Sequence, residues 1–213
     1  MVLLTEELAF PDPRYYHPMG GLIAAGGDLS PQRLWLAYNL GIFPWYNPGE
    51  EILWWCPDPR FVLYPDEVKV SKSMRKILRD NIFTFTKNQC FEEVMRGCGD
   101  APRHNQDGTW ISEQLIESFL VLHQEGKAHS YEVWRSEMLV GGFYGLAVNG
   151  VFCGESMFSK ESNASKAGFL NFVLNSGAEY DLIDCQIHSA HLESLGAREI
   201  PKSIFLETLS GTK

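Results

Sequence analysis

The chain has 213 residues, of which 45% are apolar and 21% are charged, as is usual for a globular protein. Its net charge of −9 argues against nucleic-acid binding through overall charge, so any such binding needs a local basic patch. No apolar run reaches the ~18–20 residues that span a bilayer. The first residues lack the positive region of a signal peptide. We therefore expect a cytoplasmic protein with no membrane association.

The N-terminal part of the chain differs in composition from the rest. Residues 1–60 are rich in aromatic residues, proline and glycine, which indicates a compact module packed by rings. Within it, Ser30 and Pro31 predict the start of a helix, and Gly41 predicts its end. We therefore predict two domains, a small N-terminal one over 1–62 and a larger one over 63–213.

A short helix predicted after Ser71 concentrates positive charge. From Val68 to Arg79 the chain holds five basic residues and no acidic one. Such a run is typical of a solvated helix face, and it is also the local patch that nucleic-acid binding would need. The basic residues are Lys69, Lys72, Arg75, Lys76 and Arg79.

Strands and helices alternate through the rest of the chain. Residues 82–86 predict a strand, Asn88 a helix cap, and Ser112 the cap of a helix with apolar residues at helical spacing. An antiparallel meander follows, with Asn149-Gly150 as a strong hairpin signal. The predicted strands of the meander are 128–134, 138–148 and 151–158, and after them come a helix at 164–175, a strand at 180–186, a helix at 190–195, a strand at 198–200 and a helix at 203–209.

This order predicts an α+β protein whose larger domain is similar to the N-acetyltransferase-like (GNAT) fold. The similarity raises an alternative function, acyl-CoA-dependent N-acyl transfer. Such enzymes hold the CoA pyrophosphate with a glycine-rich loop ahead of the helix that follows the meander. Residues 159–166 contain no glycine at that place, which argues against the alternative.

Two predicted strands carry polar residues where strands usually carry only packing. Side chains alternate along a strand, so Cys153, Glu155 and Met157 should share one face of the first. Asp184 and Gln186 should share one face of the second. Carboxylates and an amide among apolar residues predict a polar reaction centre beside a hydrophobic pocket.

Five cysteines give an odd count, and none forms a CxxC pair, which argues against a zinc site or a disulfide framework. We interpret most of them as buried small apolar residues. Cys153 and Cys185 remain candidates for thiol nucleophiles, because each lies in a strand with polar residues. No histidine lies near either in a recognisable motif.

The ordered motifs of the chain resemble those of the leucyl/phenylalanyl-tRNA–protein transferase family. One motif could occur by chance, but the set covers nearly the whole chain in order. The matching stretches are Gly26–Ser30, Gly41–Trp45, Leu53–Arg60, Gly108–Ile111, Ala128–Trp134, Phe152–Ser159, Asn163–Lys166, Leu182–Gln186, Ser194–Gly196 and Ile200–Pro201.

The resemblance implies a bacterial cytoplasmic enzyme. It would transfer Leu, Phe or sometimes Met from aminoacyl-tRNA to the α-amino group of proteins that begin with Arg or Lys, which marks them for N-end-rule degradation. The donor is already an activated ester, so no cofactor and no metal are expected, and we expect a monomer. A non-catalytic tRNA-binding or peptide-binding module is the other interpretation, and it leaves the polar strand pair unexplained.

The resemblance also implies roles for individual residues. Asp184 would orient or deprotonate the attacking amine, and Gln186 would hydrogen-bond the amine and the reacting carbonyl. Glu155 would hold the donor α-ammonium group, or it would be structural. The residues expected to form the donor aminoacyl pocket are Glu155, Met157, Phe172 and Phe143.

The tRNA itself would be bound by rings and by the basic helix. Tyr38, Trp45 and Trp110 would contact the terminal adenosine by stacking, with ordinary packing as the alternative. The basic helix would contact acceptor-stem phosphates. The chain departs from the family pattern at Phe143, where Met is common, and at Ser189, where Asn is common.

Overall fold

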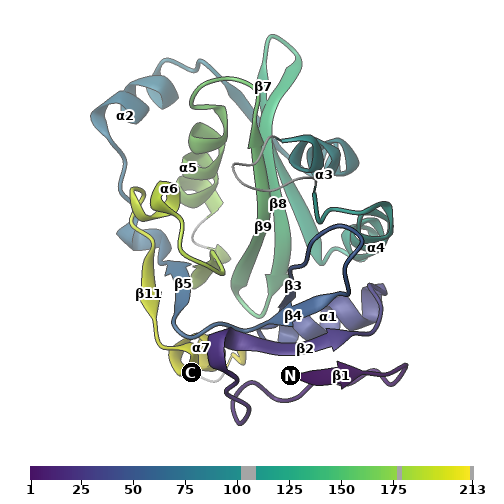
Figure 1. The fold of residues 1–213 in the computed structure, drawn as a ribbon. Helices are drawn as coiled ribbons and strands as arrows, with labels where there is room; N and C mark the ends of the chain where they lie inside the picture. The colour runs from purple at the N-terminus through teal and green to yellow at the C-terminus, as the bar shows by residue number, and fades with distance from the viewer. Residues whose placement is uncertain (102–108, 177–178, 212–213) are drawn as a thin grey trace.

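Two β-sheets organise the fold (Figure 1). The computed structural model describes residues 1–101, 109–176 and 179–211. The smaller sheet has four strands in the order β1-β2-β4-β3, and the larger has seven in the order β11-β5-β10-β9-β8-β7-β6. The protein is therefore a mixed α+β structure, as the alternation of elements predicted.

The smaller sheet lies in the aromatic-rich N-terminal part. Helix α1 begins as predicted, with Pro31 in its first turn and the Ser30 hydroxyl accepting a hydrogen bond from the Arg33 amide. Trp54 is buried at the centre of this sheet. The elements are β1 (Val2–Leu4), a 3-10 turn (Met19–Gly21), β2 (Leu22–Gly26), α1 (Pro31–Asn39), β3 (Phe43–Pro44) and β4 (Leu53–Trp55).

The larger sheet contains the predicted meander. Strands β6 to β9 are antiparallel, and β10 runs parallel to β9. Asn149 and Gly150 both have positive φ angles (47° and 81°), which confirms the predicted tight hairpin between β8 and β9. The strands are β5 (Arg60–Leu63), β6 (Thr84–Lys87), β7 (Ala128–Arg135), β8 (Met138–Val148), β9 (Val151–Ser159), β10 (Leu182–Asp184) and β11 (Arg198–Ile200).

Helices cover both faces of the larger sheet (Figure 1). Helix α5 packs on one face with α2 beside it, and α3 and α4 pack on the other. Ser71 and Ser112 cap their helices as predicted. The prediction for Asn88 was wrong, because its side chain accepts from the Ser130 amide across the sheet instead. The helices are α2 (Lys72–Arg79), α3 (Phe91–Asp100), α4 (Glu113–Gln124), α5 (Ala164–Ser176), α6 (Ala190–Glu193) and α7 (Lys202–Leu209), with a 3-10 turn at Pro65–Glu67.

The two parts of the chain share one apolar core. Ile42 and Trp54 of the N-terminal part cluster with Tyr144 and Leu146 of β8. The predicted domain boundary at residue 62 falls inside β5, which belongs to the larger sheet, so the division stays a prediction. No helix in the described part of the chain is long and apolar enough to cross a bilayer.

Candidate functional site

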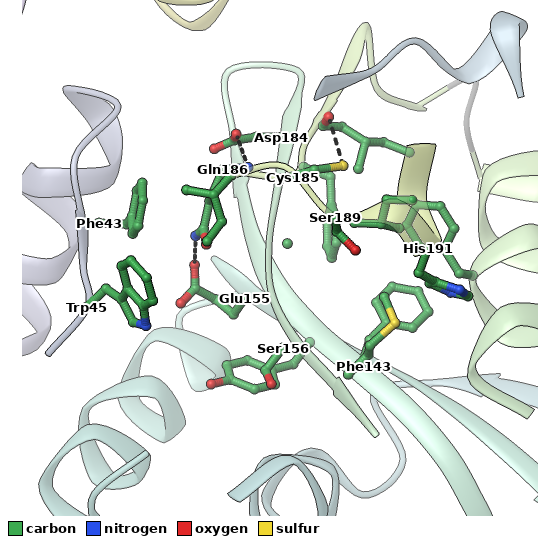
Figure 2. Close-up of a pocket in the computed structure, with 18 of the residues that line it drawn as sticks. Phe43, Trp45, Phe143, Glu155, Ser156, Asp184, Cys185, Gln186, Ser189 and His191 are labelled. Atoms are coloured by element: carbon green, nitrogen blue, oxygen red, sulfur yellow. Dashed lines mark hydrogen bonds between the residues drawn. The ribbon is translucent and has the colours of Figure 1, made fainter. Parts of the chain in front are cut away.

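A cavity of about 350 Å³ opens where β9 and β10 separate. The two strands pair only as far as Asp184, which lies opposite Cys153, while β9 continues to Ser159. The open edge of β9, the chain after β10, the β3 segment and α6 supply its walls (Figure 2). The cavity thus joins residues far apart in the sequence at the end of a parallel strand pair.

The predicted strand at 180–186 is shorter in the structure and ends at Asp184. Gln186 follows it with a left-handed backbone, at a φ of 65°. Its amide N–H donates to Asp184 Oδ1 at 2.9 Å, and its side-chain Nε2 donates to Glu155 Oε1 at 2.7 Å (Figure 2). The turn therefore separates the two side chains, so the prediction that Asp184 and Gln186 share a strand face was wrong.

A β-bulge at Glu155 explains how this carboxyl reaches Gln186. Tyr144 pairs with Ser156 and Gly145 pairs with Gly154, which leaves Glu155 as the extra residue in β9. A side chain at Gly145 would collide with the carbonyl oxygen of the opposite strand, so the close approach requires glycine.

The bulge also reverses the alternation of faces along β9. Cys153 joins the apolar cluster on the α3 and α4 side of the sheet, whereas Met157 packs with Phe143 on the α5 side. The prediction that Cys153, Glu155 and Met157 share one face was therefore wrong, because it assumed an uninterrupted period of two.

Burial raises the pKa of Glu155 to about 8, although the nearby Tyr38 hydroxyl and the Gln186 amide favour its charged form. Burial therefore favours the neutral form of this carboxyl. Tyr38 itself is buried, and burial together with the Glu155 carboxylate raises its pKa. The rim of the cavity therefore carries the carboxyl group of Glu155, which is a weak acid and accepts a hydrogen bond from the Gln186 side-chain amide.

Asp184 forms a buried ion pair with Arg60, a residue that the sequence analysis gave no role. Arg60 Nε donates to Oδ1 at 2.8 Å and Nη2 donates to Oδ2 at 2.6 Å. Burial lowers the pKa of Arg60, but the Asp184 carboxylate raises it by more, so the guanidinium stays charged. In the sequence, the one indication that Arg60 has a role is its position at the end of the motif Leu53–Arg60.

The floor of the cavity is apolar. Phe143, Met157, Phe152 and Phe169 line it. Phe172 does not, because it packs behind them with its ring centroid 4.8 Å from that of Phe152 and 5.4 Å from that of Phe143. The prediction that Phe172 lines the pocket was therefore wrong, because the residue packs behind the lining.

Two of the three rings predicted to meet adenosine lie at the cavity. Trp45 and Trp110 line it, and Trp45 is 39% exposed. Tyr38 is only 1% exposed, outside the lining, and its ring meets Phe119 edge-on at a centroid distance of 6.3 Å. A base cannot stack on a buried ring, so the prediction for Tyr38 is corrected to packing beside Glu155.

The remaining rim comes from the segment that leads into α6, which the sequence analysis largely missed. His188, Ser189, His191 and Leu192 line the cavity there. Burial, and then the charge of Lys166, lower the pKa of His191, so its imidazole is neutral at neutral pH. Its Nε2 atom is buried and forms no hydrogen bond with the described residues.

The cysteines near the cavity are poor candidates for nucleophiles. Burial raises the pKa of both Cys153 and Cys185, which disfavours the reactive thiolate. Among residues 1–101, 109–176 and 179–211, no three His, Cys, Asp or Glu side chains cluster in a way that could hold a metal ion.

The predicted basic patch is present on α2 and the turn before it. All five of its cationic residues are exposed. Arg79 pairs with Asp80, whereas the others form no ion pair with any residue that the structure describes. Helix α2 packs against α5 (Figure 1). None of its residues lines the cavity. The four unpaired cations are Lys69, Lys72, Arg75 and Lys76.

Comparison with known proteins identifies the family. The family model described as leucyl/phenylalanyl-tRNA protein transferase matches residues 62–210, and the model of the N-terminal domain of that family matches residues 27–58. The chain belongs to the leucyl/phenylalanyl-tRNA protein transferase family. This confirms the resemblance found in the sequence motifs.

Relatives match over nearly their full length. The leucyl/phenylalanyl-tRNA–protein transferase of Flavobacterium johnsoniae is 53% identical over 98% of this chain and 99% of that protein. The one from Syntrophus aciditrophicus is 54% identical over 95% of this chain and 84% of that protein. Membership of the transferase family thus extends across both sheets.

Solved structures align more weakly. A conserved protein of unknown function from Bacteroides thetaiotaomicron gives a TM-score of 0.45 at 12% identity, over 89% of this chain and 64% of that one. A GCN5-related N-acetyltransferase-like protein from Streptococcus suis gives 0.38 at 11% identity, over 75% and 59%. The GNAT-like description of the larger domain stays a prediction.

Proposed function

We propose that this protein transfers Leu, Phe or Met from aminoacyl-tRNA to the α-amino group of proteins that begin with Arg or Lys, which marks them for N-end-rule degradation. Its family membership supports the reaction class. The observation that carries the proposal is the 2.7 Å hydrogen bond between Gln186 and Glu155 at the rim of an apolar cavity. A polar centre beside an apolar pocket is what aminoacyl transfer needs.

The apolar floor would receive the side chain of the donor amino acid. Phe143 and Met157 face each other across β8 and β9 as register partners and form part of this floor. A slot of this kind accepts side chains that are unbranched at Cβ and obstructs Ile and Val near its mouth. One methyl group is worth ~1–3 kcal/mol, which makes the discrimination substantial but incomplete.

The reaction is aminolysis of an ester. The acceptor nitrogen attacks the carbonyl carbon, a C–N bond forms, the C–O bond to the tRNA ribose breaks, and the amine proton is transferred to the departing ribose oxygen through the site or solvent. The reference pKa of an α-amine is ~8, so a modest proton acceptor suffices.

Gln186 supplies the contact to the amine in this scheme. Its Nε2 is already engaged by Glu155, so its side-chain oxygen is the atom left to accept a hydrogen bond from the nucleophile. Glu155, in turn, would bind the donor α-ammonium group, which favours the charged form of a carboxyl whose pKa burial has raised.

The tRNA end would be held at two places. Trp45 and Trp110 offer rings to the terminal adenosine at the cavity, and the exposed cations of α2 would meet phosphates farther along the acceptor stem. The net charge of −9 favours acceptors with a basic first residue. We propose that the protein acts as a cytoplasmic monomer and, because the donor is an ester, without a cofactor.

Incubation with labelled Phe-tRNA and a peptide that begins with Arg tests the proposal. We expect label in the peptide, and none in the same peptide with an acetylated N-terminus or with Glu in first place. A CoA thioester offered in place of the tRNA should give no acylated peptide. An unlabelled Arg peptide would overturn the proposed function, and acylation from the thioester would favour the acyl-CoA alternative.

A further inference from the structure

Arg60 lies directly behind the polar rim of the cavity, yet it touches none of the space where substrate would bind. Its side chain is 1% exposed, and the residue is outside the cavity lining. It comes from β5, whereas its partner Asp184 ends β10, 124 positions later in the chain. Burying a charge pair costs free energy unless its hydrogen bonds are well formed. The position of this pair beside the cavity therefore needs an explanation.

Three hydrogen bonds from the protein hold the carboxylate of Asp184. Oδ1 accepts from Arg60 Nε and from the Gln186 amide, and Oδ2 accepts from Arg60 Nη2. The side chain has no exposed surface. A carboxylate bound in this way is badly placed to take a proton from an incoming amine. What it does is anchor the amide of a residue whose left-handed backbone needs such support.

Aromatic rings from two distant segments fix the guanidinium. Its central carbon lies 4.8 Å from the ring centroid of Phe43 in β3 and 4.4 Å from that of Phe205 in α7. Cation–π contacts of this kind hold the plane of the group as well as its charge. The position of Asp184 is therefore set jointly by the smaller sheet, β5 and α7.

We propose that Arg60 is a positioning residue for the transfer reaction. It fixes Asp184 as the anchor of the Gln186 turn, so that the Gln186 side chain meets the attacking amine and Asp184 does not act as the base. The inference rests on the proposed function. Lysine cannot replace the guanidinium, because an ammonium group lacks the paired donors that grip both carboxylate oxygens.

A double-mutant cycle on Arg60→Met and Asp184→Asn tests the role, with kcat and KM measured for Phe-tRNA. We expect Arg60→Met to lower kcat about 100-fold, as a misplaced catalytic group does, and to leave KM nearly unchanged. Asp184→Asn should give a similar loss, and the double variant should be no worse than either single one. Losses that multiply would overturn the proposal, because the two residues would then act independently.

Arg33→Met is the matched control. Arg33 is also fully buried, and its Nε also binds a carboxylate, that of Asp28 at 3.1 Å. It lies in α1, outside the cavity lining. We expect this variant to melt at a lower temperature while its folded fraction keeps the wild-type kcat. If Arg60→Met did the same, Arg60 would be a structural residue only and the proposal would fail.

If Arg60→Met does not fold, Arg60→Lys studied by ¹⁵N NMR provides a second test. We expect the backbone amide resonance of Gln186 to shift and kcat to fall about 10-fold or more, because a lysine cannot grip both oxygens of Asp184. An unchanged resonance or an unchanged kcat would overturn the role of Arg60. A wild-type protein that transfers nothing would instead overturn the proposed function, and the resonance would still report on the positioning.

Discussion

The cavity and helix α2 contrast in how each would recognise aminoacyl-tRNA. Glu155 and Gln186 at the cavity are partly buried and are joined by a specific hydrogen bond. The cations of α2 are exposed and mostly unpaired among the residues that the structure describes. A single change should therefore be severe in the cavity, whereas the effect of α2 should decline gradually as its charges are removed. Substitutions in the two regions test this contrast.

Loss of the Gln186 side chain should have the largest effect. Gln186→Ala removes both the proposed contact to the amine and the partner of Glu155. We expect kcat to fall about 100-fold or more, as for loss of a contact that positions the attacking group. Single-turnover kinetics with Phe-tRNA and an Arg peptide measure it. Gln124→Ala, at the exposed end of α4, should leave the rate unchanged.

Filling the apolar floor should change donor choice. Met157→Phe adds a ring at the floor, so kcat/KM should fall more for Phe-tRNA than for Leu-tRNA, by about 10-fold or more. Competition between the two charged tRNAs measures the ratio. Met138→Phe, at a 61% exposed position at the start of β8, provides the matched substitution and should leave the ratio alone. An equal fall for both donors would contradict the assignment of this floor to the donor side chain.

Neutralising α2 should weaken binding without changing chemistry. Replacing Lys72, Arg75 and Lys76 with Gln should reduce the slope of log affinity against log salt by up to about 0.7–0.9 for each phosphate that the helix no longer neutralises. The kcat at saturating tRNA should stay the same. Filter binding across a salt series measures the slope. Changing Arg14, Arg96 and Arg135, which already pair with carboxylates, should alter it less.

The smallest effect that we expect is a pH dependence of stability, and it comes from the titration of Glu155. Its pKa is raised from 4.5 to about 8 in the folded state, so the folded protein binds more protons than the unfolded chain between these values. The contribution of Glu155 is therefore fully present below pH 4.5 and is lost as the pH rises through 8. Melting curves of wild type and Glu155→Gln should diverge over this range. Parallel curves would show that the folded site does not retain the proton.

Local signals in the sequence predicted much of the fold. Ser30, Ser71 and Ser112 cap helices because a hydroxyl satisfies a free amide wherever a helix starts. Asn149-Gly150 makes its hairpin because both residues tolerate positive φ. The sequence also identified Glu155, Asp184 and Gln186 as a polar centre, since their types are unusual in strands.

The arrangement of that centre could not be predicted from local patterns. The bulge at Glu155 depends on how β9 pairs with β8, and the turn at Gln186 depends on an acceptor at Asp184. An assumed regular alternation along each strand therefore identified the residues of the polar centre but assigned their side chains to the wrong faces of the sheet. The buried positions of Tyr38 and Phe172 likewise follow from packing that no single segment encodes.

The sequence by itself determined the family, the α+β class and the three polar residues that meet at the cavity, because motifs, caps and turns are encoded over short distances. Only the tertiary structure decided what each residue touches. It brought Arg60 to Asp184 across 124 positions and set the guanidinium of Arg60 against rings from β3 and α7. Contacts of this kind arise when distant segments pack together, so the geometry of the site depends on the fold as a whole.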